Sequence, residues 1–99
     1  MNGFHGRILN VDLDVRQFSI ETVADDILKT YLGGKGLGSL LLYEKNPAGV
    51  DSLDGKNVII FVAGPATGSA IWGGCRYGVF TKSPLTGMYS ESYSGGRVP

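Results

Sequence analysis

Glycine-rich turns set the strongest limit on how this chain can fold. The segment 63–87 reads AGPATGSAIWGGCRYGVFTKSPLTG, and Ser94-Gly95-Gly96-Arg97 follows a few residues later. Glycine pairs let the main chain adopt positive φ and approach a ligand closely, and the outward N–H groups can form an anion-binding concavity. Two of these turns carry an arginine, Arg76 and Arg97, whose fork of donors matches phosphate. The pattern is typical of a cradle for a phosphorylated ligand.

Length and charge indicate one small globular domain. A chain of 99 residues buries roughly two thirds of its unfolded surface. Nine basic residues balance nine acidic ones, which gives no electrostatic footprint for nucleic acid or an anionic membrane. The sequence has neither an apolar run of about 18 residues nor a leader-like N-terminal segment. We therefore expect a soluble, cytoplasmic protein.

Few side chains are suited to catalysis. Cys75 is the only cysteine, so the segment forms no internal disulfide and cannot hold an iron–sulfur cluster by itself. His5 is the only histidine, and it lies near the N-terminus, where a surface role is expected. Lys35 in the sequence GGKGLG lacks the spacing of a phosphate-binding Walker loop, and a corner between two helices explains it better. No catalytic residue is predicted.

Apolar patterning predicts five strands. Alternation over 7–13 and 17–22 predicts an N-terminal hairpin. The nearly continuous apolar run within 57–63 predicts a strand covered on both faces, at the centre of the sheet. The segments 77–82 and 88–93 flank a connection with the proline and glycine of a hairpin turn.

Two short helices are predicted between the hairpin and the central strand. Asp25 and Asp26 suit a helix N-terminus, and Gly33-Gly34 would cap its C-terminus. A second helix is predicted after Gly36, and Asn46-Pro47 ends it. The fold class is therefore α+β, with a mixed or antiparallel β-sheet and two short helices.

An ordered set of motifs resembles a known family. These motifs are Gly6-Arg7, Gly33-Gly34-Lys35-Gly36-Leu37, Ala63-Gly64-Pro65, Gly73-Gly74-Cys75-Arg76-Tyr77, TKSPLTG at 81–87, and Ser94-Gly95-Gly96. Together they resemble the N-terminal domain of the tungsten-containing aldehyde ferredoxin oxidoreductase family. The resemblance covers essentially the whole chain, and implies that residues 1–99 are the first half of a pseudo-symmetric pterin-binding domain.

The resemblance also implies an activity and its cofactors. Members of the family oxidise aldehydes to carboxylic acids and pass two electrons through a [4Fe–4S] cluster to ferredoxin. The implied cofactor is a tungstopterin, a bis-molybdopterin holding tungsten or, alternatively, molybdenum, with a magnesium ion bridging the pterin phosphates. The cluster ligands and proton-transfer residues of relatives lie outside this segment, which alone is not expected to be active. A homo-oligomer is expected, and the aldehyde is not identified.

Three residues take site roles through the resemblance. Arg76 matches an arginine that contacts the pterin, and Gly95 matches a main-chain donor to it. Tyr93 matches a position whose main-chain carbonyl helps to bind the magnesium ion, a role that needs no particular side chain. Arg97-Val98-Pro99 departs from the family pattern, in which an aromatic residue and glycine often follow the glycine pair.

The sequence also permits other interpretations of these residues. An arginine at the start of a strand is more often a solvated surface residue, and a glycine pair alone is usually only a turn. The chain could also act as a stand-alone, non-catalytic binding module related to that domain. Such a module would expose a sheet edge and an apolar face and would self-associate.

Overall fold

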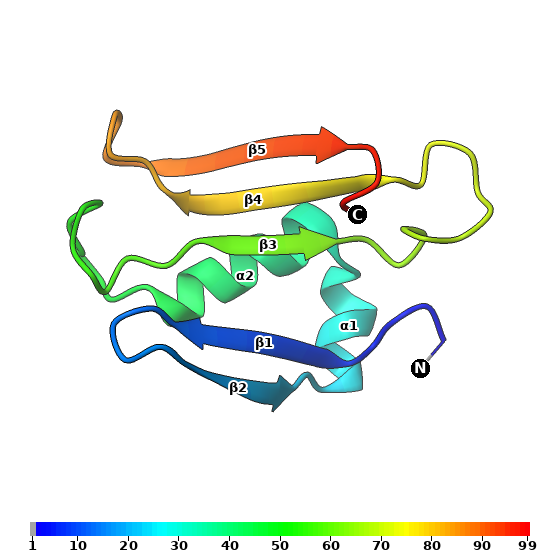
Figure 1. Ribbon diagram of the computed structural model, residues 1–99, viewed down its shortest axis with the longest axis horizontal. Coiled ribbons are helices and arrows are strands. Elements are labelled where there is room, and N and C mark those ends of the chain that lie inside the picture. Colours follow the sequence, from blue (N-terminus) through cyan, green and yellow to red (C-terminus); the bar gives the residue numbers. More distant parts are fainter. Residues whose placement is uncertain (1) are drawn as a thin grey trace.

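The two alternating segments at the N-terminus form the predicted hairpin (Figure 1). In the computed structural model, which describes residues 2–99, β1 (Arg7–Asp12) pairs antiparallel with β2 (Gln17–Thr22). Leu9 stands opposite Ile20, and Val11 stands opposite Phe18, on one face of the hairpin. The Asp12 carboxylate accepts a hydrogen bond of 3.0 Å from the Asp14 N–H and fixes the turn.

Two helices follow, α1 (Asp25–Tyr31) and α2 (Gly34–Lys45). Their junction differs from the prediction. Leu32, with φ +62°, is the C-cap of α1, while Gly33 is the N-cap of α2, which begins before Gly36. Glycine is needed at 33 for packing, because a Cβ there would lie 2.8 Å from the Ala63 carbonyl oxygen. The glycine pair therefore serves the corner and the second helix rather than the end of the first.

The remaining strands, β3 (Ile60–Ala63), β4 (Arg76–Lys82) and β5 (Tyr89–Gly95), form a separate antiparallel sheet. Their order is β3-β4-β5. The turn between β4 and β5 is closed by the Ser83 N–H, which donates to the Met88 carbonyl at 2.8 Å. The predicted α+β class and the order of all seven elements are confirmed.

The predicted central position of β3 is wrong for the described residues 2–99. There β3 is an edge strand that pairs only with β4, and Ile59 and Phe61 are 57% and 64% exposed. The apolar run also predicted cover on both faces, which is wrong for these residues, because Phe61 and Ala63 are exposed on one face of the strand. It carried no information about which strands lie beside it, because pairing partners are distant in sequence.

One helical layer covers the same face of both sheets, and Figure 1 shows α1 and α2 behind the strands. The core cluster contains Val23, Leu28, Leu37 and Leu41, and residues from β1 and β3 pack against it. Phe80 on β4 is completely buried. The opposite face carries apolar side chains that are more than half exposed: Leu9, Val11, Phe18, Ile20, Ile59 and Phe61.

Candidate anion-binding site

Glycine-rich segments meet at the end of the molecule where β3 ends and β4 begins. A Cβ on Gly74 would lie 2.8 Å from the Ala66 carbonyl oxygen, and one on Gly95 would lie 3.0 Å from the Cys75 carbonyl oxygen. The corner at Gly33 packs equally closely on the last residue of β3. The helix corner, the 64–75 loop and the turn after β5 therefore gather at one end through backbone contacts that a side chain would block.

Two of the predicted cofactor-binding residues stand directly opposite each other at this end. Arg76, the first residue of β4, is the register partner of Gly95, the last residue of β5. Arg97 follows Gly96, which has φ +93°. Both arginines are exposed, and within residues 2–99 neither has a carboxylate within 4.0 Å. The site thus presents two uncompensated guanidinium groups beside glycine backbone.

The N-terminus of α2 lies at the same end of the molecule (Figure 1). This helix of 12 residues has no acidic residue in its first turn and no side-chain cap at Gly33. Its free N–H groups and positive dipole end favour an anion. The local electrostatics therefore agree in sign with those of the two arginines.

Lys35 is engaged elsewhere. Its Nζ lies 3.0 Å from Glu91 Oε2, and Glu91 also accepts a hydrogen bond from the Tyr89 hydroxyl at 3.1 Å. The Ser39 and Tyr89 hydroxyls are 2.9 Å apart. This cluster joins α2 to β5. Sequence reasoning missed it, since the contact between Lys35 and Glu91 spans 56 positions and leaves no local pattern.

Tyr93, the predicted magnesium ligand, lies on β5 and stands opposite Gly78 of β4. Its ring packs edge-on against Phe80, with centroids 5.9 Å apart. Desolvation raises the pKa of the Tyr93 hydroxyl, and the nearby negative charge of Glu91 raises it by a smaller amount. Its side chain is therefore used in packing, and metal binding through its main-chain carbonyl stays a prediction. No cluster of three or more histidine, cysteine or acidic side chains that could hold a metal occurs in the described part of the chain.

The ion pair between Lys35 and Glu91 predicts a pH dependence of stability. The hydrogen bond from Lys35 lowers the pKa of Glu91, and the bond to Glu91 raises the pKa of Lys35. Because the pKa of Glu91 is lowered, its ionised carboxylate stabilises the fold above the unfolded-state pKa, and this stabilisation is lost as the pH falls through the lowered pKa. Because the pKa of Lys35 is raised, its stabilisation is lost as the pH rises through the raised pKa. Because both groups are exposed, we expect a small effect.

The test is thermal unfolding of the Glu91→Gln protein as a function of pH. We expect its melting temperature to fall less than that of the unmodified protein on acidification. Glu44→Gln is the matched control, because no Lys or Arg in residues 2–99 lies within 4.0 Å of Glu44. If the melting temperatures of Glu91→Gln and the unmodified protein fell equally on acidification, the ion pair would contribute nothing to stability.

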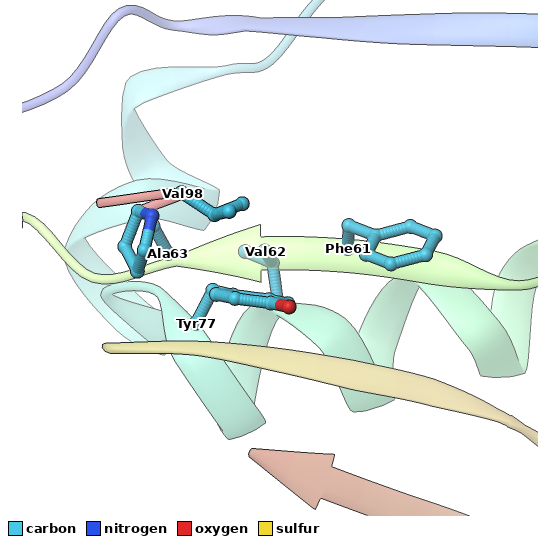
Figure 2. Close-up of a pocket in the computed structure, with 6 residues that line it drawn as sticks. Phe61, Val62, Ala63, Tyr77 and Val98 are labelled. Carbon is cyan, nitrogen blue, oxygen red and sulfur yellow. The ribbon is translucent and has the colours of Figure 1, made fainter. Parts of the chain in front are cut away.

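A small apolar pocket of about 240 Å³ lies beside the candidate site (Figure 2). Phe61, Val62, Ala63 and Tyr77 contribute to its lining, together with Val98 and Pro99. None of these side chains is charged, and neither Arg76 nor Gly95 lines the pocket. The pocket is therefore unsuited to an anion, and we place the candidate site at the glycine loops.

The fold and the loop cluster define an α+β domain whose glycine-rich loops carry two exposed arginine side chains at one end. Residues 8–99 match the family described as aldehyde ferredoxin oxidoreductase, N-terminal domain. The chain is 40% identical over 96 residues to the tungsten-containing aldehyde ferredoxin oxidoreductases of Pyrococcus furiosus and Pyrococcus abyssi. It belongs to this family of oxidoreductases.

The alignments cover 97% of this chain but only 16% of each of these two relatives. A solved structure, the active-site complex BamBC of benzoyl-coenzyme A reductase with 1,5-dienoyl-CoA, superimposes with a TM-score of 0.88 and 29% identity. That match covers 93% of this chain and 14% of the other. Neither helix in residues 2–99 is long and apolar enough to span a membrane.

Proposed function

We propose that this chain is the N-terminal segment of a tungstopterin and iron–sulfur oxidoreductase that oxidises aldehydes to carboxylic acids, with ferredoxin as the electron acceptor. In this proposal, residues 1–99 form part of the base on which the cofactor sits. The observation that carries it is the pairing of Arg76 with Gly95 at the end of the sheet where the glycine loops converge. Family membership supports the proposal, and tungsten is proposed as the metal because the relatives are named as tungsten-containing enzymes.

The residues present fit the phosphate part of such a cofactor. Arg76 and Arg97 have no carboxylate partner in residues 2–99, so both guanidinium groups are free to donate to phosphate oxygens. Gly95 has no side chain between its backbone and a ligand, and the adjacent Gly96 adopts positive φ. The end of the sheet therefore offers charge and close backbone approach together.

When bound, the tungstopterin supplies the two-electron redox chemistry. The work of this chain is positional and electrostatic. Arg76 would donate hydrogen bonds to pterin phosphate, and the Gly95 N–H would add a main-chain donor. The main-chain carbonyl oxygen of Tyr93 would coordinate the magnesium ion. Magnesium is a hard cation that takes oxygen ligands and keeps several waters when it binds phosphates.

The other parts of the proposed enzyme lie outside these residues. Cys75 is the only thiol, so the [4Fe–4S] ligands would come from further polypeptide, as would the aldehyde pocket. Ferredoxin, a cytoplasmic location and a homo-oligomeric state are proposed from family membership alone. The choice of tungsten rather than molybdenum rests on the names of the relatives.

Substitution of Arg76 tests the proposed cofactor base. We expect Arg76→Gln in the intact protein to lower cofactor occupancy about tenfold or more, because a charge-assisted hydrogen bond contributes about 1.5–3 kcal/mol. Metal content by mass spectrometry and pterin fluorescence after oxidation both report occupancy without relying on activity. Arg16→Gln, in the β1–β2 turn, is the matched control. Full occupancy in the Arg76→Gln protein would contradict the proposed role.

A second candidate function is a non-catalytic module that self-associates. The exposed apolar face of the sheets favours it, since Val11 and Phe18, which stand opposite each other, are 57% and 72% exposed. Faces of this kind mark interaction surfaces. Sedimentation of the purified protein distinguishes the candidates. A cofactor-free self-associating species supports the module, and a cofactor-loaded protein supports the oxidoreductase.

A further inference from the structure

An open groove separates the two sheets. It has a volume of about 1410 Å³, and residues of β1, β2 and β3 contribute to its walls. Figure 1 shows β1 and β3 side by side, and no hydrogen-bonded ladder joins the two sheets within residues 2–99. Leu28, Leu37 and Leu41 of the helical layer also line the groove.

Two strand edges without partners face this groove. In the described residues 2–99, β1 pairs only with β2, and β3 pairs only with β4. The second edge of each strand therefore offers N–H and C=O groups that lack a ladder. Such edges pair readily with another strand, and backbone groups need partners once they are covered. An extended strand would satisfy both edges at once, whereas a helix would satisfy neither.

Both strands pack on the same side of the helical layer. Ile8 of β1 and both Ile60 and Val62 of β3 pack against the same cluster of helix residues. A strand placed between β1 and β3 would rest on that cluster as its neighbours do. The two small sheets would then become one continuous sheet, in the order β2, β1, inserted strand, β3, β4, β5.

We propose that a β-strand of the same polypeptide, from outside residues 1–99, occupies this groove and joins the two sheets. The chain spans 16% of the length of the curated relatives, whose remaining polypeptide is long enough to supply such a strand. Pro99 itself lines the groove, so polypeptide attached there needs no long linker to reach it. This inference goes beyond the proposed function and does not depend on a cofactor.

The groove specifies the character of the inserted strand. β3 has 4 residues and β1 has 6, so a strand of that length matches its walls. β1 and β3 run in opposite directions (Figure 1), so the insert is parallel to one and antiparallel to the other. One of its faces meets the helices, and the other continues the exposed apolar face. We therefore expect a nearly continuous run of Val, Ile and Leu rather than an alternating one.

The insertion would also change the position of β3 in the sheet. Its sequence suits a strand covered on both faces, yet Phe61 is 64% exposed and the strand lies at an edge in residues 2–99. With a strand between β1 and β3, β3 becomes an interior strand. This interior position would agree with the one that the sequence predicts for β3, while the face that carries Phe61 would stay open.

Hydrogen exchange of the intact protein tests the inserted strand. We expect the amides of β1 and β3 that point into the groove to exchange about a hundredfold or more slowly than free amides. The protection should be the same at low and high protein concentration. Exchange at the rate of free amides would overturn the proposal. So would protection that disappears as an oligomer dissociates on dilution, because the strand would then come from a second copy.

Photo-crosslinking identifies the source of the strand. A benzophenone side chain replaces Phe61, which lines the groove, in a mixture of unlabelled and nitrogen-15-labelled protein. We expect crosslinks within one chain, to a peptide outside residues 1–99. Crosslinks between labelled and unlabelled chains, or none at all, would contradict the assignment. The control replaces Leu85, which is 92% exposed and does not line the groove; it should not capture the same peptide.

Discussion

Phe80→Ala is expected to destabilise this domain by about 4 kcal/mol, within the range measured when buried aromatic side chains are truncated. Phe80 is 0% exposed and is the largest fully buried side chain in residues 2–99. The ring lies against Gly38 of α2 and Gly78 of β4, with the Tyr89 and Tyr93 rings beside it. The two glycines have no side chains that could relax into the vacated volume. The cavity would therefore remain open, which places the expected loss above the lower end of the range.

Peptide-level hydrogen exchange over α2 and β4 measures this loss in the intact protein. The control is Leu85→Ala, since Leu85 is 92% exposed in the turn between β4 and β5; we expect a change within about 0.5 kcal/mol there. If the two substitutions had similar effects, Phe80 would not be the centre of this packing.

Gly38→Ala is expected to destabilise the domain by about 2 kcal/mol, although alanine is the better helix former. A Cβ at 38 would lie 2.4 Å from Phe80 Cδ2, which is inside van der Waals contact with a ring that has no room to move. Overpacking of a core costs about 1–3 kcal/mol, and the clash is severe enough to place this site at the upper end. The gain in helix propensity is about 1 kcal/mol. Packing therefore outweighs propensity.

A double-mutant cycle with Phe80→Leu separates the two effects. If the ring causes the penalty, Gly38→Ala should cost at least about 1 kcal/mol less in the Phe80→Leu background than in the unmodified protein. An equal cost in both backgrounds would assign the penalty to the helix backbone instead. The same exchange measurement over α2 gives both values.

Sequence patterns were sufficient for the local structure. Period-two alternation predicted 17–22 with its observed bounds, because successive side chains of a strand point to opposite faces. The half-burial that such alternation implies is not observed, since all six residues of β2 are exposed. Glycine and proline marked the turn at 83–87, where Gly87 has φ +69°. The family motifs also selected Arg76 and Gly95, and the β4–β5 register places these residues opposite each other.

Long-range features carried no comparable signal. The contact between Lys35 and Glu91 joins residues 56 positions apart. The assignment of Gly33 to the start of α2, rather than the end of α1, depends on how closely that corner approaches Ala63. A glycine can serve either end of a helix, and only the neighbouring backbone decides which.

The sequence by itself determined the class of the domain, the order of its elements and the residue types suited to an anion, because these follow from local periodicity, backbone freedom and side-chain chemistry. Only the tertiary structure decided that the glycine loops gather at one end, that Phe80 fills the space left by two glycines, and that β1 and β3 stand unpaired across a groove. These are relations between segments distant along the chain. They arise when the strands and helices pack, and no single segment encodes them.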